Sequence, residues 1–350
     1  MKKTLALILA ALMILTLFAG CSKDEPAAAD DTSADTAQTD TDTSETDGDA
    51  SETGDVFKVA WQHNWSDQWH HQTALVGEMR MEEAFDNVEV TLFDSKGDAG
   101  NIVPFLEQLI MEGDWDLCIY GTYSDDSEYI KKLQDTGCNV ICYAIEWDFL
   151  KGVCSTFVCS EYDLGYLAAT RAAELLPENA NVVVLRGAEG YSGSILRGEG
   201  FADALAERDD ITVLDEKFCS FDKAKAMTQM EDWITRFGTD IDGILSENDA
   251  MALGAIEALN MAGIDAASLV ITGIDALYEG CVAIKEGLID VSAYQSSDLY
   301  AEGFIDRIEK LQSGEVDAYC TDDMVFEAQM VTVDNVDEMI ARYEELGMAQ

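Results

Sequence analysis

From residue 56 onward, short β-rich runs alternate with longer helical stretches, and this alternation limits the fold more than any other feature of the chain. The runs are almost continuously apolar, which is typical of strands that are covered on both faces. Strand–helix alternation predicts βαβ units and parallel sheets. The expected strands are VFKVAW, NVEVTLF, DLCIY, NVICYA, STFVC, NVVVLR, ITVLDE, DGILS, LVITGI and DVSAY.

The number of expected strands favours two sheets over one. About ten strands are more than a single twisted parallel sheet usually holds. We therefore expect an α/β fold with two Rossmann-like lobes, each built on a parallel sheet, and a ligand cleft between them. In open parallel sheets, ligands bind beyond the carboxyl ends of the strands.

The first 20 residues, MKKTLALILAALMILTLFAG, combine two lysines with an unbroken apolar run and small residues, and they predict a secretory signal. The sequence around Cys21 resembles a bacterial lipobox, which implies cleavage before Cys21 and a lipid on its thiol. An ordinary cleaved signal and an uncleaved membrane anchor are the alternatives. Apart from this run, the sequence contains no apolar stretch approaching 18 residues.

Residues 21–55 are dominated by Asp, Thr, Ser and Ala, with almost no large apolar side chain. Such a segment cannot bury enough surface to offset its ordering entropy, so we expect an acidic, disordered tether. Its carboxylates repel one another and favour an extended chain. A lipid on Cys21, a tether and a folded body together predict an extracytoplasmic protein anchored to the cell membrane.

The formal net charge of −48 excludes several classes of partner. Binding of nucleic acid requires clustered Lys and Arg, and so does docking on an anionic membrane through a basic patch. We therefore expect no nucleic acid and no membrane contact apart from the lipid. The eight cysteines after Cys21 are widely spaced and include no CxxC pair, so we expect buried thiols that pack as small apolar groups.

Polar and aromatic side chains follow the expected strands of both halves. Asn64, Trp65 and Trp69 follow the first strand, and Glu146 follows NVICYA. The later strands are followed by Arg197, Phe221, Asn248, Asp275 and Gln295. Flat apolar faces suit the C–H surface of a sugar, and planar polar groups suit its paired hydroxyls. These residues predict a site for a polyhydroxylated ligand.

All three histidines lie in the stretch WQHNWSDQWHH, as His63, His70 and His71. Imidazole is a preferred zinc ligand, so a metal site is one hypothesis. Neighbouring histidines on a helix point about 100° apart, however, and no cysteine is close by. Trp65 and Trp69 are four residues apart and share a helical face, which favours a stacking wall for a ligand; simple packing is the third interpretation.

Four segments carry a further signal: ILSENDAMALGAIEALNMAGI, VITGIDALYEGCVAIKEGLIDVSAYQ, VVVLRGAEGYSGSILRGEGFADAL and FVCSEYDLGYLAATRAAELL. Together they resemble the ribose/galactose type of periplasmic sugar-binding protein, the substrate-binding lipoprotein of an ABC transporter. The resemblance covers roughly residues 56–335. It implies a hinge of three crossovers near residues 159, 295 and 325. The lobes would be 56–159 plus 296–325, and 160–295 plus 326–350.

The resemblance also implies site roles. Arg197, Asn248, Asp275 and Gln295 would contact sugar hydroxyls, and Phe221 would stack on the ring. The loop at residues 63–71 would form the opposite wall, with Trp65 and Trp69 stacking on the ligand and Asn64 or Asp67 as a polar contact. Glu146 would replace an aspartate of the family, offset by two residues. The opening loop also lacks the Asn-Pro-Phe-Phe pattern of ribose binders, so ribose is not the expected ligand.

Each site residue also has a structural interpretation. Asn248 or Asp249 could cap the following helix, and we expect Asp249 to cap it while Asn248 faces the cleft. Asp275 could cap a helix that begins at residue 276. Arg197 could form a surface ion pair, Phe221 could belong to the core, and Gln295 could bond only the backbone.

We therefore expect a monomeric solute-binding lipoprotein, not an enzyme, that captures a sugar or polyol and delivers it to an ABC transporter permease. We expect no cofactor and no resident metal. One alternative is a receptor that presents a sugar, nucleoside or signal molecule to a membrane sensor kinase. Another is a zinc-binding lipoprotein.

The segment GYSGS at residues 190–194 is close to the nucleophile elbow of a serine hydrolase. It ends in serine where that motif requires glycine, which argues against such an enzyme.

Overall fold

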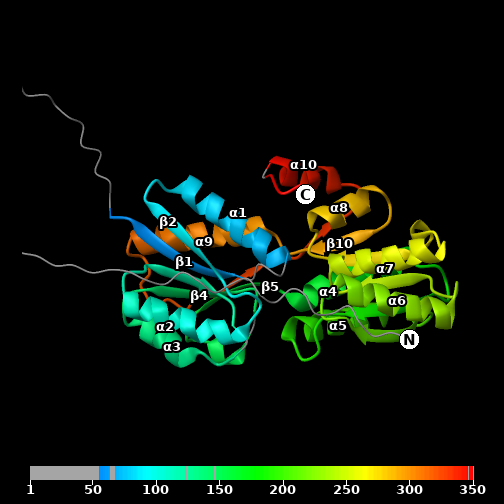
Figure 1. Ribbon diagram of the computed structural model, residues 1–350, viewed down its shortest axis with the longest axis horizontal. Coiled ribbons are helices and arrows are strands. Elements are labelled where there is room, and N and C mark those ends of the chain that lie inside the picture. The colour runs from blue at the N-terminus through cyan, green and yellow to red at the C-terminus, as the bar shows by residue number, and fades with distance from the viewer. Residues whose placement is uncertain (1–54, 64–67, 123, 146, 346, 350) are drawn as a thin grey trace, which may run out of the picture. The chain divides into compact units, whose positions relative to one another are not determined.

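The computed structural model describes residues 55–63, 68–122, 124–145, 147–345 and 347–349. Their strands form two six-stranded sheets, each with helices on both faces (Figure 1). This arrangement confirms the expected α/β class with two lobes. We call the first sheet with its helices the first lobe and the second sheet with its helices the second lobe.

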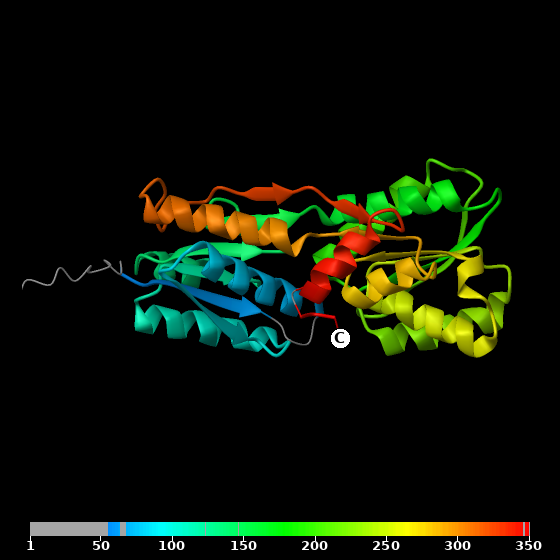
Figure 2. The same cartoon turned by 90° about the horizontal axis from the view of Figure 1, so that it is seen from above.

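The first sheet is entirely parallel in the order β11-β5-β4-β3-β1-β2. Its strands are β1 (Phe57–His63), β2 (Val88–Asp94), β3 (Leu117–Tyr120), β4 (Asn139–Tyr143), β5 (Ser155–Cys159) and β11 (Met324–Phe326). Helices α1 (Gln68–Ala84) and α9 (Ser297–Gln312) lie side by side on one face (Figure 1, Figure 2). Helices α2 (Ile102–Glu112) and α3 (Ser127–Gln134) cover the other.

Alternation along the buried strands divides the first-lobe core into two layers. In β1, Val59 and Trp61 join the cluster under α1 and α9, while Ala60 joins the cluster under α2 and α3. In β3, Leu117 and Cys118 alternate in the same way. Successive side chains of a strand point to opposite faces, so a strand buried on both faces must be apolar throughout.

The second sheet has the order β12-β10-β9-β8-β6-β7, and only the β10–β12 pair is antiparallel among the described strands. Its strands are β6 (Asn181–Arg186), β7 (Thr212–Phe218), β8 (Gly243–Ser246), β9 (Val270–Ile274), β10 (Val291–Tyr294) and β12 (Gln329–Val331). One core layer packs against α4 (Glu161–Leu175) and α5 (Ser192–Leu205). The other packs against α6 (Lys223–Phe237), α7 (Asp249–Ala262), α8 (Tyr278–Lys285) and α10 (Val336–Glu345).

The chain passes between the two sheets at three places. It leaves the first sheet after β5, returns after β10 through α9, and leaves again between β11 and β12. These crossings lie where a three-segment hinge was expected. The sequence did not reveal β11 and β12, because each has only three residues and shows too short a pattern to separate a strand from a loop.

The eight described cysteines carry free thiols. Seven are buried, as expected of thiols that pack as small apolar groups, whereas Cys320 is partly exposed. Cys21 lies outside the described residues. Within the described ranges, no helix combines the length and the apolar content needed to cross a membrane.

Helices α4 and α5 approach each other through glycines, and this contact sets the position of α5. A Cβ atom on Gly165 would lie 2.2 Å from the carbonyl oxygen of Arg197, and one on Gly200 would lie 2.3 Å from that of Tyr162. Only the lack of a side chain allows backbones to pack this closely. Gly200 of the RGEGF run therefore has a packing role, and the contact fixes the helix that carries Arg197.

We predict that Gly165→Ala lowers the free energy of unfolding by about 1–3 kcal/mol, because the added methyl group overpacks the α4–α5 contact. Ala202→Ser adds one atom to the exposed side of α5 and serves as a control with a change below about 0.5 kcal/mol. Chemical denaturation measures both. Equal stability of Gly165→Ala and the wild type would contradict the prediction, because it would show that the two helices can move apart without a loss of stability.

Candidate functional site

A cavity of about 650 Å³ lies at the carboxyl ends of the second-lobe strands and is also lined by residues of the first lobe. Six of the nine predicted ligand contacts line it: Trp69, Arg197, Phe221, Asn248, Asp275 and Gln295. The other three, Asn64, Trp65 and Glu146, lie outside the described residues. The position of the cavity follows the rule that ligands bind beyond the carboxyl ends of parallel strands.

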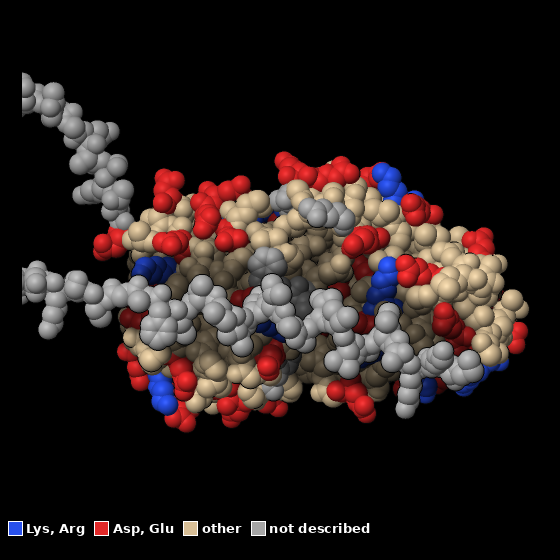
Figure 3. Space-filling view, in the orientation of Figure 1, with Lys and Arg blue, Asp and Glu red and all other residues tan. Residues whose placement is uncertain are grey.

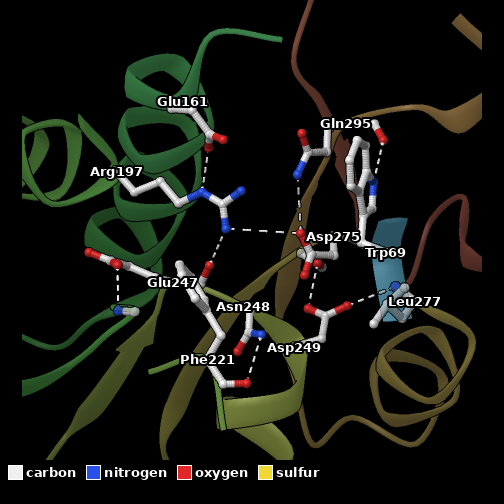
Figure 4. Close-up of polar contacts among 12 residues, drawn as sticks. Trp69, Glu161, Arg197, Phe221, Glu247, Asn248, Asp249, Asp275, Leu277 and Gln295 are labelled. Atoms are coloured by element: carbon white, nitrogen blue, oxygen red, sulfur yellow. Dashed lines mark hydrogen bonds and ion pairs between the residues drawn. The ribbon is translucent and has the colours of Figure 1, made fainter. Parts of the chain in front are cut away.

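Arg197 is buried in the wall of the cavity, and Figure 4 shows its polar contacts with the neighbouring residues. Its Nε donates to Glu161 Oε2 at 2.5 Å, and its Nη1 donates to the carbonyl oxygen of Glu247 at 2.6 Å. Nη1 also lies 4.0 Å from Asp275 Oδ1. A buried guanidinium requires such partners, because an uncompensated charge is expensive to remove from water. The geometry excludes the surface ion pair that the sequence left open.

Asp275 and Gln295 follow neighbouring strands and meet at the cavity. The Nε2 of Gln295 donates to Asp275 Oδ1 at 3.3 Å (Figure 4). The carbonyl oxygen of Gln295 accepts a hydrogen bond from Trp69 Nε1 at 3.1 Å. Gln295 therefore bonds through its side chain as well as its backbone, and it joins the first turn of α1 to the second lobe.

Three consecutive acidic or amide residues follow β8, and each has a separate role. Asn248 is the N-cap of α7, where its Oδ1 accepts from the backbone N–H of Met251 at 2.9 Å. The prediction that Asp249 caps this helix was therefore wrong, although Asn248 lines the cavity as expected. Glu247 is buried and accepts from the side chains of Arg186 and Ser194 and from the backbone N–H of Gly187. It anchors the segment that leads into α5.

Asp249 is buried behind the cavity and supports the turn that presents Asp275. Its Oδ2 accepts from the backbone N–H of Leu277 at 2.9 Å, and its Oδ1 accepts from Ser292 Oγ at 2.7 Å (Figure 4). Ser292 Oγ in turn accepts from the backbone N–H of Ala276 at 2.9 Å. Helix α8 begins only at Tyr278, so Asp275 does not cap it.

The turn at Asp275 has an unusual backbone. Asp275 has φ 109° and Ala276 has φ 48°, in a region that residues with a side chain adopt rarely. Such a conformation persists when the surroundings fix it. Ala276 is held further by the Tyr343 hydroxyl, which donates to its carbonyl oxygen at 2.8 Å. Tyr343 also accepts from Gln72 Nε2 at 2.9 Å, so the turn is connected to α1 of the first lobe.

Aromatic rings form much of the remaining wall. Phe221 lines the cavity with the Arg197 guanidinium 5.7 Å from its ring centre, and Tyr191 meets its edge at 5.9 Å. Trp69 lines the cavity but is 4% exposed, because it also packs on Tyr143 and Tyr300. Trp69 thus belongs to both the core and the wall.

Several lining residues were not assigned a ligand contact from the sequence, notably Glu161, Tyr191 and Trp147. Trp147 follows β4 and Glu161 follows β5, so both lie at strand ends, where the rule expects a ligand. Tyr191 lies in the segment that connects β6 to α5, directly before the first residue of α5. It lies in the glycine-rich GAEGYSG turn, whose path no local pattern specifies.

The three histidines occupy different surroundings. His63 is buried at the end of β1, and burial lowers its pKa to about 4. His70 lines the cavity beside Trp69, and the rings of His63 and His71 lie 6.3 Å apart. Across the part of the chain that the structure describes, no group of three or more His, Cys, Asp or Glu residues is placed to hold a metal ion.

Burial raises the pKa of Asp249 to about 7, against 3.8 for an ordinary aspartate. Between these values the folded state holds a proton that the unfolded state has lost. Asp249 therefore contributes most to stability below about pH 4, and this contribution falls as the pH rises to about 7. We predict that the wild type loses stability relative to Asp249→Asn as the pH rises through this window. The difference between their free energies of unfolding changes by up to about 1.4 kcal/mol per pH unit.

Urea denaturation of both proteins at several pH values measures this difference. Asp240→Asn, at an exposed position, is the control, and its stability should run parallel to that of the wild type. Parallel curves for Asp249→Asn would contradict the predicted proton uptake.

Comparison with known proteins places this chain in a family. A model of the periplasmic binding protein domain matches residues 63–315. The xylitol-binding protein of Mycolicibacterium smegmatis is 34% identical over 168 residues, which cover 48% of this chain and 47% of that protein. That match therefore spans about half the length of this relative. The ribose import binding protein of Escherichia coli is 27% identical over 227 residues, covering 65% of this chain and 75% of that protein.

A solved structure extends the comparison to the whole fold. An ABC transporter solute-binding protein from Bacillus halodurans, crystallised with bound myo-inositol, aligns with a TM-score of 0.71 and 25% identity. The alignment covers 84% of this chain and 100% of that chain. The family match, the two mostly parallel sheets and the cavity at their strand ends agree. The chain belongs to the periplasmic binding protein family of two-lobed solute-binding proteins.

Proposed function

We propose that this protein captures a sugar or polyol in the cavity and delivers it to the permease of an ABC transporter. One observation carries the proposal: a cavity of about 650 Å³ combines buried planar polar groups with aromatic faces at the strand ends of both lobes. Planar groups match pairs of hydroxyls, and aromatic faces match the C–H surface of a sugar. The relatives named above, which bind xylitol, ribose and myo-inositol, support this class of ligand.

In this proposal, Arg197, Asn248, Asp275 and Gln295 bond ligand hydroxyls, and Phe221 stacks on the ligand. Trp69 belongs to the opposite wall. Asn64, Trp65 and Glu146, outside the described residues, keep their proposed contacts. Ligand contacts from both lobes select a closed form, because only that form makes all of them at once.

The proposed organisation of the chain follows from the sequence. Residues 1–20 act as a signal peptide, Cys21 carries a lipid, and residues 21–55 form a tether. The lobes comprise 56–159 plus 296–325 and 160–295 plus 326–350. The protein acts as a monomer outside the cytoplasm, where a tethered binding protein can reach its permease.

A ligand panel tests the capture step. We expect a sugar or polyol at 100 times its dissociation constant to stabilise the protein by about 2.7 kcal/mol, which raises the melting temperature by several degrees. The panel contains pentoses, hexoses, polyols, nucleosides and zinc, and thermal melting measures each. A shift with zinc alone would replace the sugar proposal with a metal-binding function.

Two substitutions test the site. We predict that Asp275→Ala and Arg197→Ala each weaken binding of the sugar identified by the panel at least tenfold, because each removes a buried polar contact. Arg236→Ala, which removes an exposed arginine paired with Asp215 and Asp232, is the control and leaves affinity unchanged. Calorimetry measures affinity, and circular dichroism checks the fold. Wild-type affinity in both cavity variants would show that the ligand binds elsewhere.

A further inference from the structure

The cavity wall carries more negatively than positively charged side chains. The described lining residues include the carboxylates of Glu161, Glu189, Asp222 and Asp275 and a single guanidinium, Arg197. Four carboxylates against one guanidinium leave a formal charge of −3 with His70 neutral. Lys225 lies close to this rim, where its Nζ donates to Ser220 Oγ at 3.1 Å, and it adds one positive charge. The wall remains acidic with that lysine included.

The guanidinium is already compensated by the protein. Arg197 donates to Glu161 at 2.5 Å and to the Glu247 carbonyl at 2.6 Å, and Asp275 lies 4.0 Å away. Glu161, Arg197 and Asp275 are all buried, so water screens their interaction weakly. A ligand carboxylate or phosphate would therefore add a further negative charge beside two existing ones. Arg197 can bond hydroxyls here, but it does not offer an uncompensated positive charge to an anion.

The aromatic rings of the cavity favour a positively charged ligand group. Trp69, Trp147, Tyr191 and Phe221 line the same cavity. The face of an aromatic ring is negative and attracts cations, and Phe221 already lies 5.7 Å from the Arg197 guanidinium. Outside the cavity, Asp and Glu side chains are spread over the visible face with few Lys and Arg between them (Figure 3). Such a surface attracts cations toward the site and repels anions.

We propose that the ligand is a sugar or polyol that carries a protonated amino group. This inference rests on the proposed function and narrows its ligand class. The hydroxyls meet the planar polar groups described above, and the ammonium group lies against the acidic and aromatic wall. The neutral parent compound binds more weakly, and the corresponding acid is rejected.

Matched ligands test the inference by isothermal titration calorimetry with the purified protein. One series is D-glucose, D-glucosamine and D-glucuronate, and the other is myo-inositol with an amino-deoxyinositol. We expect the amino compound of the accepted skeleton to bind at least tenfold more tightly than its neutral parent. The uronate should bind at least tenfold more weakly than glucose if the hexose skeleton is accepted. The amino preference should shrink with added salt, because salt screens charge interactions.

The outcomes separate the inference from the proposed function. A neutral parent that binds as tightly as its amino derivative, or a uronate that binds as tightly as glucose, overturns the inference and leaves sugar capture intact. Absence of binding across these series and the wider panel of sugars and polyols overturns both.

A charge variant tests whether the wall causes the preference. Glu161→Gln keeps the shape of the side chain and removes one buried carboxylate, so the amino preference should fall at least threefold and any uronate binding should strengthen. Glu174→Gln, at an exposed position on the same helix, is the matched control. Asp222→Asn preserves a side chain that can cap α6 and provides a second test should Glu161→Gln fail to fold. Equal preferences in the cavity variants and the control would overturn the inference.

Discussion

The site depends on the buried hydrogen bonds made by the residues that follow β8. Glu247 holds the segment leading into α5, Asn248 caps α7, and Asp249 holds the turn at Asp275. A buried polar side chain without partners would be expensive, so each of these side chains holds nearby backbone and hydroxyl groups in one arrangement. The result is a hydrogen-bonded frame that spans β6, β8, β9 and β10. This frame sets the positions of the side chains that face the cavity.

Two features connect this frame to the rest of the molecule. The glycine contact between α4 and α5 sets the depth of Arg197, and Glu161 at the start of α4 neutralises it. On the other side, Gln72 and Tyr343 link α1 to the carbonyl of Ala276, and Trp69 reaches the backbone of Gln295. The turn that presents Asp275 is therefore connected to the first lobe through Tyr343 and Gln295. A change in the contacts between the lobes would reach the cavity through these few bonds.

Much of the fold was predictable because its signals are local. Continuous apolar runs specify strands buried on both faces, and all ten expected strands occur in the structure. Six of the predicted ligand-binding residues line the cavity, because they lie in the segments that follow those strands. The roles of Asn248 and Asp249 were not predictable: both residue types cap helices, and only the position of Ser292 and Leu277 decides which one is drawn into the core. The charge balance around Arg197 was equally hidden, because Glu161 is 36 residues away in the chain.

The sequence alone determined the α/β class, the division into two sheets and the strand ends that bear the polar side chains, because these follow from periodicity and apolar content over short windows. Tertiary structure decided which of those side chains face the cavity, which support it from behind, and how the charges pair. Those outcomes depend on contacts between segments tens to hundreds of residues apart, such as Trp69 with Gln295 and Gln72 with Tyr343. No local sequence pattern encodes such contacts, because they form only when both sheets and their helices are packed.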